Sequence, residues 1–484
     1  MMGAVPEPGG HARKVGNHWA RRTVLFLASL MFFACQAKPS LVKPRLEEDG
    51  QLFVYLQSLT QEAERLTFRL EGMSAVRGDG STVPVSLRLE EVRGTDVKRE
   101  RLLASGDLPP GQYLGFSFRV KEATLKGEEG ETALQPADEK PMTSVPFAIA
   151  RRKAQVVSLK FLYRESLPGG IRFSPSFTAE IPGKIATGLM GMVSSRGGNT
   201  VTVFDKLTGK VIAVVPTGTS PSGMALNPAL RRAYVAISGE DAVEAIDLLG
   251  SEVINRGVLT IGDRPEELAL TPDRRTLLSA NTGSNTVSVV DAASLVETRR
   301  IQVGNGPQSI LVDRAGRRAY VFNTLSNTIS VLDLGALAVA ATVATDSGPV
   351  RGEFNRNGNR LYVLHKYSPY LSVFDATTLS IVRRVYVGTG GTALKVDPRT
   401  DLIYLARRGT GEVAIYDPFS FLPIDSYRTG QDVSYLTIDG EGNNLFVVFS
   451  GGNEVRLIHL VGKAMASGIE VAEDPFWVTV MGER

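Results

Sequence analysis

Short runs in which apolar and polar residues alternate recur at regular spacing along the last three-fifths of the chain. The clearest run, residues 285–291 (NTVSVVD), returns 42 residues later at residues 327–333 (NTISVLD). Similar runs continue this spacing, with one step of 44 residues, and end at Asp205, Asp247, Asp375, Asp417 and His459. Alternation with a period of two predicts strands, and a repeat of this length is typical of a radial array of small β-sheets. The pattern therefore predicts seven β modules.

Each repeat carries three further strand-like runs. An aromatic or aliphatic run such as residues 319–322 precedes the alternating run, and runs such as residues 299–304 and 309–313 follow it. Four strands with their turns fill about 42 residues, which is the size of one propeller blade. The Asn residues at the start of the alternating runs tolerate positive φ, and the Asp residues at their ends can accept hydrogen bonds from the following backbone. We therefore expect these Asn and Asp residues to shape turns rather than bind a ligand.

The two ends of the repeat region complement each other. The first copy begins with residues 188–195, which correspond to the second strand of a blade, and the chain ends with residues 476–480, which correspond to a first strand. We therefore expect the C-terminal strand to complete the first blade. Closure of this kind leaves no open sheet edge in the ring.

These repeats resemble a known family. A Tyr-Val pair such as Tyr320-Val321, a run such as NTVSVVD, and a Val-Gly-x-x-Pro segment are together similar to the YVTN β-propeller repeats of bacteria and archaea, which also occur in surface-layer proteins. The resemblance covers residues from about 185 to 484 and implies a seven-bladed β-propeller. Because that family hosts several functions, the resemblance implies no single activity.

Residues 50–182 have no 42-residue period. Alternation in residues 66–70 (LTFRL) and 85–89 (VSLRL) predicts strands with one wet face, and Gly- and Pro-rich segments separate such strands. We expect an antiparallel β-sandwich here, followed by the propeller in residues 183–484. The segment from Leu108 to Tyr113 (LPPGQY), with the strands after it, resembles a prealbumin-like domain of uncharacterised bacterial lipoproteins. The domain is expected to act as a spacer or as a second binding module.

The N-terminal segment has the features of an export signal. Arg21 and Arg22 precede residues 23–34, an apolar run that is too short for a membrane span of about 20 residues. The run ends just before Cys35, the only cysteine of the chain. This arrangement resembles a bacterial lipoprotein signal, which implies cleavage before Cys35 and its acylation; ordinary cleavage and an uncleaved anchor stay open as alternatives. We expect a signal segment at 1–35, a tether at 36–49, and an exported protein that is an outer-membrane lipoprotein or is located in the periplasm or at the cell surface.

Charge and motif content exclude several function classes. The 54 basic and 51 acidic side chains give a net charge of +3, so no field suited to nucleic acid is expected. The chain has four histidines, and the two beyond the signal segment, His365 and His459, are far apart in sequence. Metal-ligand spacing, a nucleophile elbow and a phosphate-binding glycine loop are all missing from the sequence. We therefore expect no catalytic residue, no metal and no cofactor.

Candidate ligand-binding residues occupy the start of each blade's first strand and the loops around it, because these positions differ between copies while the turn positions stay alike. The eight candidates are Arg264, Glu266, Gln308, Arg351, Thr392, Asp432, Tyr435 and Trp477. Trp477, Tyr435 and Arg351 would give the propeller mouth an aromatic and cationic rim. In the alternative interpretation, Trp477 and Tyr435 plug the channel or pack between blades.

Two classes of function fit these features. The first is a non-enzymatic envelope protein, attached to the membrane through a lipid anchor, that binds a protein, a glycan or a small ligand. The second is an extracytoplasmic propeller enzyme, such as a lactonase-like hydrolase or an oxidoreductase. For the second class, the plausible carboxylates are Glu266, Glu267, Asp432 and Asp474. We favour binding, with no nucleic-acid partner.

Overall fold

The computed structural model describes residues 49–128, 130–136, 141–440, 443–462 and 465–483, and within them the chain is almost entirely β-structure. The helices in these ranges are short 3₁₀ turns: η1 (Gln61–Arg65), η2 (Pro168–Gly170), η3 (Thr187–Leu189) and η4 (Ser450–Gly452). Not one helix of the described ranges has the length and apolar character needed to cross a membrane. The predicted all-β class is confirmed. The predicted signal segment and nearly all of the predicted tether lie outside the described residues.

The N-terminal strands form one curled sheet. Its strands are β1 (Gly50–Leu56), β2 (Leu66–Arg77), β3 (Thr82–Leu87), β4 (Glu91–Arg93), β5 (Arg101–Leu108), β6 (Gly111–Lys126), β7 (Glu131–Pro136), β8 (Met142–Ile149), β9 (Ala154–Phe161), β10 (Arg172–Phe173) and β11 (Phe177–Glu180). The main path runs β10-β7-β6-β2-β3-β5-β1-β9-β11, with β4 on β2 and β8 on β6. The sheet encloses a core in which Phe68 stacks on Phe161 and packs at a tilt against Phe173.

This curled sheet is compatible with the predicted sandwich and differs from it in two respects. All its strands belong to a single hydrogen-bonded sheet rather than two separate ones. Two of its pairs, β1 with β9 and β10 with β7, are parallel, whereas the other pairs are antiparallel. Alternation in the sequence predicts that a strand has one buried face, but it does not state the direction of the neighbouring strand.

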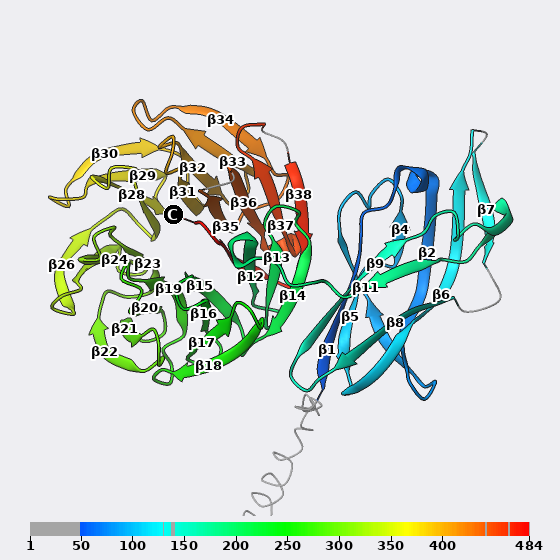
Figure 1. Ribbon diagram of the computed structural model, residues 1–484. Coiled ribbons are helices and arrows are strands. Elements are labelled where there is room, and N and C mark those ends of the chain that lie inside the picture. Colours follow the sequence, from blue (N-terminus) through cyan, green and yellow to red (C-terminus); the bar gives the residue numbers. More distant parts are fainter. Residues whose placement is uncertain (1–48, 129, 137–140, 441–442, 463–464, 484) are drawn as a thin grey trace, which may run out of the picture. The chain divides into compact units, whose positions relative to one another are not determined.

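Residues from β12 onward form seven four-stranded sheets arranged in a ring, as Figure 1 shows. From the inner to the outer strand, blade 1 contains β39 (Pro475–Val480), β12 (Met190–Ser195), β13 (Thr200–Asp205) and β14 (Val211–Pro216); blade 2, β15 (Pro221–Asn227), β16 (Arg232–Ile237), β17 (Ala242–Asp247) and β18 (Glu252–Val258); blade 3, β19 (Pro265–Leu270), β20 (Thr276–Asn281), β21 (Thr286–Asp291) and β22 (Glu297–Gln302); blade 4, β23 (Pro307–Val312), β24 (Arg318–Asn323), β25 (Thr328–Asp333) and β26 (Ala338–Ala344). Blade 5 contains β27 (Pro349–Phe354), β28 (Arg360–His365), β29 (Tyr370–Asp375) and β30 (Ile381–Tyr386); blade 6, β31 (Gly391–Val396), β32 (Ile403–Arg407), β33 (Glu412–Tyr416) and β34 (Pro423–Arg428); blade 7, β35 (Tyr435–Asp439), β36 (Asn444–Phe449), β37 (Glu454–His459) and β38 (Met465–Glu470). The predicted seven-bladed propeller is confirmed.

The burial of the strands follows from the stacking of the blades. The third strand of blade 3, β21, buries every residue except its final Asp291, because neighbouring blades cover both faces of the sheet. Asn285 before it adopts a φ of 60°, and Asp291 accepts a hydrogen bond from the backbone N–H of Ser294 at 2.8 Å. These residues have the turn roles expected from the sequence.

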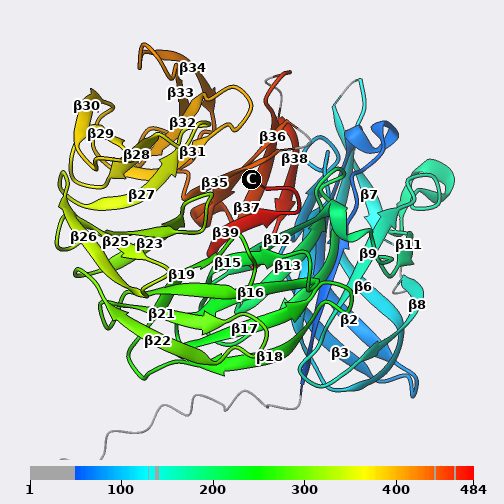
Figure 2. The ribbon, with the colours of Figure 1, turned by 60° about the vertical axis from the view of Figure 1, so that its left-hand side comes forward.

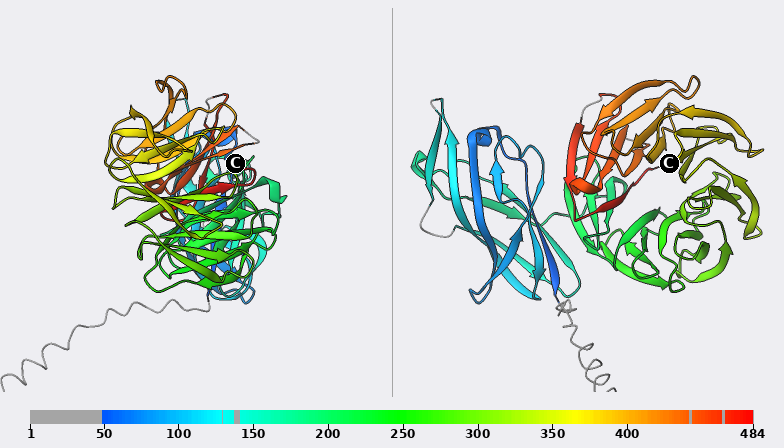
Figure 3. Two further views of the ribbon diagram at one scale, coloured as in Figure 1. Left: turned by 90° about the vertical axis from the view of Figure 1, so that its left-hand side faces the viewer. Right: turned by 180° about the vertical axis from the view of Figure 1, so that it is seen from behind.

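The ring closes as the repeat pattern predicts. β39 pairs antiparallel with β12, with Val480 opposite Gly191 and Trp477 opposite Ser194. In Figure 2 the red β39 lies beside the green β12, and the right panel of Figure 3 shows the closed ring from its other face. One strand from the end of the chain therefore completes a blade whose other three strands come from the start of the propeller.

The curled sheet contacts blades 1 and 7 within the compact unit formed by residues 48–484. Tyr55 of β1 belongs to the same buried apolar cluster as Val214 of β14. Glu470, the last residue of β38, accepts a hydrogen bond from the backbone N–H of Leu102 at 2.9 Å and forms an ion pair with Arg101. The sheet therefore contacts both blade 1, within which the ring closes, and the neighbouring blade 7.

Candidate functional site

The seven inner strands line the axis of the propeller, since each contacts the inner strands of the two neighbouring blades. Strand order is the same in every blade, so equivalent connections gather at the same end of this channel. We call one end the turn end, because the turns from the first to the second strand lie there. The other end, which we call the loop end, holds the segments that lead into the first strands and those that join second to third strands.

Three of the candidate residues meet inside the channel. The rings of Tyr435 and Trp477 stack with 4.0 Å between their centroids, and each side chain is about 95% buried. The guanidinium carbon of Arg351 lies 4.8 Å from the centroid of Tyr435 and 5.0 Å from that of Trp477. These are cation–π distances. The three side chains therefore pack on one another within the channel and do not form an open rim.

Glu267 completes this group. Its Oε2 lies 3.1 Å from Nη2 of Arg351, and Ser309 donates a hydrogen bond to its Oε1 at 3.3 Å. Burial raises the pKa of Glu267 to about 6, against the opposing effect of the Arg351 charge. The sequence placed Glu267 at the entry of an inner strand and named it as a carboxylate for the enzyme alternative, and in the structure it is the direct ion partner of Arg351.

The other candidates make separate contacts. Glu266 forms an ion pair with Arg196 at 2.7 Å. Two candidates form side-chain hydrogen bonds: Thr392 donates to the backbone carbonyl of Val433 at 2.7 Å, and Gln308 accepts from the hydroxyl of Thr324 at 3.1 Å. The last two contacts involve loop backbone: the N–H of Arg264 donates to Asp241 at 2.7 Å, and Asp432 accepts from the N–H of Gly409 at 2.6 Å. These contacts hold loops and neighbouring strands in place. Their role in ligand binding stays a prediction.

Two of the carboxylates expected for an enzyme have different ion partners. Glu266 and Glu267 follow each other in β19 but form ion pairs with different arginines. In the part of the chain that the structure describes, no group of three or more His, Cys, Asp or Glu residues is arranged to hold a metal ion.

A second charged group fixes the segment that follows β39. Nζ of Lys395 lies 3.3 Å from carboxylate oxygens of both Glu353 and Glu483. Glu483 also accepts hydrogen bonds from Thr437 and from Thr479. The segment after β39 thus runs into the centre of the ring, as the red ribbon in Figure 1 shows.

The turn end contains a cavity of about 930 Å³. Its apolar wall includes Met224, Leu226, Leu270, Val480 and Met481, and Trp477 also contributes to the lining. Three arginines add positive charge: Arg274, Arg314 and Arg356. They occupy the turns between the first and second strands of blades 3, 4 and 5. The cavity therefore combines an apolar wall with cationic groups from three consecutive blades.

The turns that carry these arginines are tied to one another. Nη1 of Arg314 donates to the backbone carbonyl of Arg356 at 2.7 Å, and Nη1 of Arg356 donates to that of Arg399 at 3.2 Å. Nδ2 of Asn227 donates to the backbone carbonyl of Arg274 at 3.2 Å. Each of these hydrogen bonds joins the turn of one blade to the turn of the next blade.

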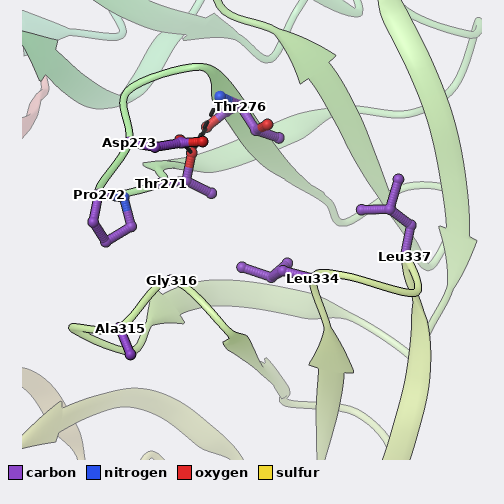
Figure 4. Close-up of a pocket in the computed structure, with 8 residues that line it drawn as sticks. All are labelled: Thr271, Pro272, Asp273, Thr276, Ala315, Gly316, Leu334 and Leu337. Carbon is purple, nitrogen blue, oxygen red and sulfur yellow. Dashed lines mark hydrogen bonds between the residues drawn. The ribbon is translucent and has the colours of Figure 1, made fainter.

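A smaller cavity of about 210 Å³ lies between blades 3 and 4 and shares Thr271 and Pro272 with the large one. Figure 4 shows Asp273 turned toward Thr271, whose hydroxyl donates to the Asp273 carboxylate at 2.6 Å. Leu334 and Leu337 cover the opposite side in the same view. Because Asp273 is engaged within its own turn, this smaller cavity is chiefly a gap between two blades.

The sequence interpretation did not identify the turn-end arginines. These arginines lie in turns, and the sequence pattern of a turn is explained by its backbone geometry alone. The signal was nevertheless present, since every connection between the first and second strands of blades 2 to 6 contains an arginine: Arg231, Arg274, Arg314, Arg356 and Arg399.

Comparisons with known proteins agree with this architecture. Residues 202–398 match the family described as YNCE-like beta-propeller. This part of the propeller is therefore similar to that family. The match and the seven four-stranded sheets together confirm the propeller resemblance expected from the sequence. A search of curated proteins gives no significant match.

Solved structures similar to this propeller differ widely in their names. A putative 6-phosphogluconolactonase from Bacteroides fragilis is 17% identical, with a TM-score of 0.53, and the match covers 62% of this chain and 99% of that one. The Kuenenia stuttgartiensis hydrazine synthase is 18% identical, with a TM-score of 0.52 and coverage of 56% and 93%. The dihydro-heme d1 dehydrogenase NirN is 14% identical, with a TM-score of 0.50 and coverage of 62% and 77%. At these identities the similarity establishes the fold alone.

Proposed function

We propose that the protein is a non-enzymatic binding protein of the cell envelope, in which the turn end of the propeller recognises a ligand. One observation carries the proposal: a cavity of about 930 Å³ at this end is lined by three arginines, all of them exposed. The charged side chains deeper in the channel, such as Glu267 and Arg351, instead pair with one another. The turn end therefore presents charge that is directed to solvent. The ligand is an envelope protein, a glycan or a small molecule.

The leader supports an envelope location. Residues 23–34 are apolar and precede Cys35, so the mature protein would carry acyl chains on its first residue. The curled sheet would then separate the propeller from the membrane or provide a second binding surface. Cys35→Ser is expected to move the protein from the membrane fraction to the soluble fraction, because each buried lipid methylene contributes about 0.8 kcal/mol to attachment. Fractionation followed by immunoblotting measures this shift, and retention in the membrane fraction would count against the lipid anchor.

The binding role is tested by affinity capture from the native envelope. The double variant Arg314→Glu/Arg356→Glu reverses two charges in the cavity wall and is expected to lose most of the material captured by the wild type. Arg299→Glu is the matched control, because Arg299 is exposed on the outer strand of blade 3, away from the channel. The readout is the amount of bound material, determined by mass spectrometry, with melting temperature confirming that each variant is folded.

Equal capture by the wild type and the double variant would refute recognition at the turn end. Consumption of a captured small molecule by the purified protein would instead favour the enzyme class. Both outcomes are read from the same samples, since the eluate is analysed before and after incubation with fresh protein.

A further inference from the structure

Three arginines line one cavity from equivalent turns of consecutive blades. Arg274, Arg314 and Arg356 each follow the first strand of their blade, and all three line the turn-end cavity. The guanidinium groups of Arg314 and Arg356 are held in place, because they donate hydrogen bonds to the backbone carbonyls of Arg356 and Arg399. A site with fixed cationic groups on several rigid elements can hold an anion with little reorganisation.

The carboxylates in the same turns are engaged elsewhere. The Asp273 carboxylate accepts a hydrogen bond from the backbone N–H of Arg275 at 3.1 Å, and the Asp313 carboxylate accepts one from the backbone N–H of Arg317 at 2.8 Å. Asp401, in the equivalent turn of blade 6, accepts a hydrogen bond from the backbone N–H of Arg356 at 2.7 Å. Among the described residues, no carboxylate forms an ion pair with the guanidinium groups of the three cavity arginines. Their positive charge is therefore available to a ligand.

The one carboxylate in the cavity lining is also compensated. Glu483 lines the cavity, but Lys395 lies 3.3 Å from its Oε1, and Thr479 donates to its Oε2 at 2.9 Å. The net charge of the side chains that line the cavity is thus positive, because three arginines face one carboxylate that Lys395 already neutralises. An anionic group is favoured over a neutral or cationic one at this place.

The remainder of the lining is largely apolar. Met224, Leu226, Leu270 and Met481 contribute side chains, with Trp477 also in the lining. The cavity volume of about 930 Å³ lies within the range of about 300–1,000 Å³ that small-molecule sites occupy. Bare inorganic anions would leave this apolar wall unused.

From this arrangement we infer that the turn-end cavity binds a small amphiphilic anion, with a phosphate or carboxylate group on Arg274, Arg314 and Arg356 and an apolar portion along the wall that includes Trp477 and Met481. The inference rests on the proposed binding function and adds the chemical class of the ligand. It differs in position from the loop-end site predicted from the sequence, and of the residues predicted there it shares only Trp477.

Tryptophan fluorescence provides a direct test. The chain has two tryptophans, Trp19 and Trp477, so the full chain with Trp19→Phe reports from the cavity alone. Titration with hexyl phosphate is expected to give a saturable change in emission. Hexyl glucoside, which carries a similar apolar chain without charge, is expected to give none. Pyrophosphate, which has charge without an apolar portion, is expected to bind more weakly than hexyl phosphate.

Variants connect the signal to the arginines. Arg314→Gln/Arg356→Gln is expected to weaken hexyl phosphate binding at least about tenfold, because both substitutions remove charge-assisted hydrogen bonds to the anion. Arg274→Gln provides a second variant that leaves the hydrogen bonds between turns intact and should weaken binding in the same direction. Arg299→Gln, on the outer strand, should bind as the wild type does. Equal binding by all the variants, or equal binding of hexyl phosphate and hexyl glucoside, would overturn the inference.

Two further comparisons complete the test. The first distinguishes a lipid headgroup from a free anion, and the second distinguishes failure of this inference from failure of the proposed function. Co-sedimentation with phosphatidylcholine vesicles, with and without phosphatidylglycerol, distinguishes a lipid headgroup from a free amphiphile, because only the former gives arginine-dependent retention on the anionic vesicles. If hexyl phosphate fails to bind but the Arg314→Glu/Arg356→Glu variant still loses its envelope partner, the ligand class is wrong and the binding function stands. Failure of both experiments removes both proposals.

Discussion

Removal of residues 474–484 is expected to open the propeller ring and to leave most of the protein insoluble. The deletion takes away β39, so β12 loses the partner that now pairs with it from Gly191 to Ser195. It also removes the buried side chains of Trp477, Val478 and Val480. Each fully buried side chain of this size contributes about 1.5–3 kcal/mol, and whole domains are stable by only about 5–15 kcal/mol. The measurements are the soluble fraction after expression and the melting temperature by circular dichroism.

A shorter deletion serves as the control. Removing residues 482–484 keeps every residue of β39 and loses the contacts of Glu483 with Lys395 and Thr479. This variant should stay soluble, with a lower melting temperature. If the longer deletion melted at the temperature of the wild type and stayed soluble, β39 would not be the element that closes the ring.

Arg351→Met is expected to destabilise the folded protein by about 3–5 kcal/mol, which is typical when one partner of a buried ion pair is removed. The side chains of Arg351 and Glu267 are only 14% and 8% exposed, so the variant leaves the Glu267 carboxylate buried without its partner. It also removes the cation that packs on Tyr435 and Trp477. Urea unfolding monitored by circular dichroism measures the loss.

The double variant Glu267→Met/Arg351→Met tests the cause. Replacing a buried ion pair by apolar residues is often nearly neutral, so the double variant should recover most of the lost stability. Equal instability of the single and double variants would show that packing on the aromatic rings, and not the unpaired charge, dominates at this position.

The same pair gives stability a pH dependence. Burial raises the pKa of Glu267 from 4.5 to about 6, so the folded state binds a proton more readily than the unfolded chain between these values. The contribution of this group to the free energy of unfolding therefore increases as the pH falls from about 6 to about 4.5, and it is lost as the pH rises through the same window. Glu267→Gln should remove this contribution, which the difference between the two stability profiles would reveal.

The sequence predicts the propeller well because its determinants are local. Alternation specifies each strand, Asn285 and Asp291 specify the turns on either side of β21, and a constant repeat length forces equivalent strands to the same place in each blade. Ring closure also follows, since the first copy lacks one strand and the end of the chain supplies it. In the curled sheet, by contrast, the parallel pairing of β1 with β9 joins segments separated by about a hundred residues, and local alternation contains no information about that pairing.

The candidate site was predicted less completely for a related reason. The sequence placed Arg351, Tyr435 and Trp477 near the axis, but their stacking within the channel depends on how closely the inner strands approach one another. That distance is set by the whole ring and not by any one repeat. The turn-end arginines, by contrast, are a local feature of each repeat. They were missed because they recur as regularly as residues that only shape the turn.

The pairing of β39 with β12 imposes an order on folding, because the two strands come from opposite ends of the propeller segment. Blades 2 to 7 can each assemble from one continuous segment, but blade 1 must wait until residues 475–480 have left the ribosome. The edge of β12 therefore stays uncovered until the whole segment between β14 and β39 is in place. Until then the chain offers an unsatisfied backbone edge to any neighbouring chain, so misassembly of this protein would begin at β12.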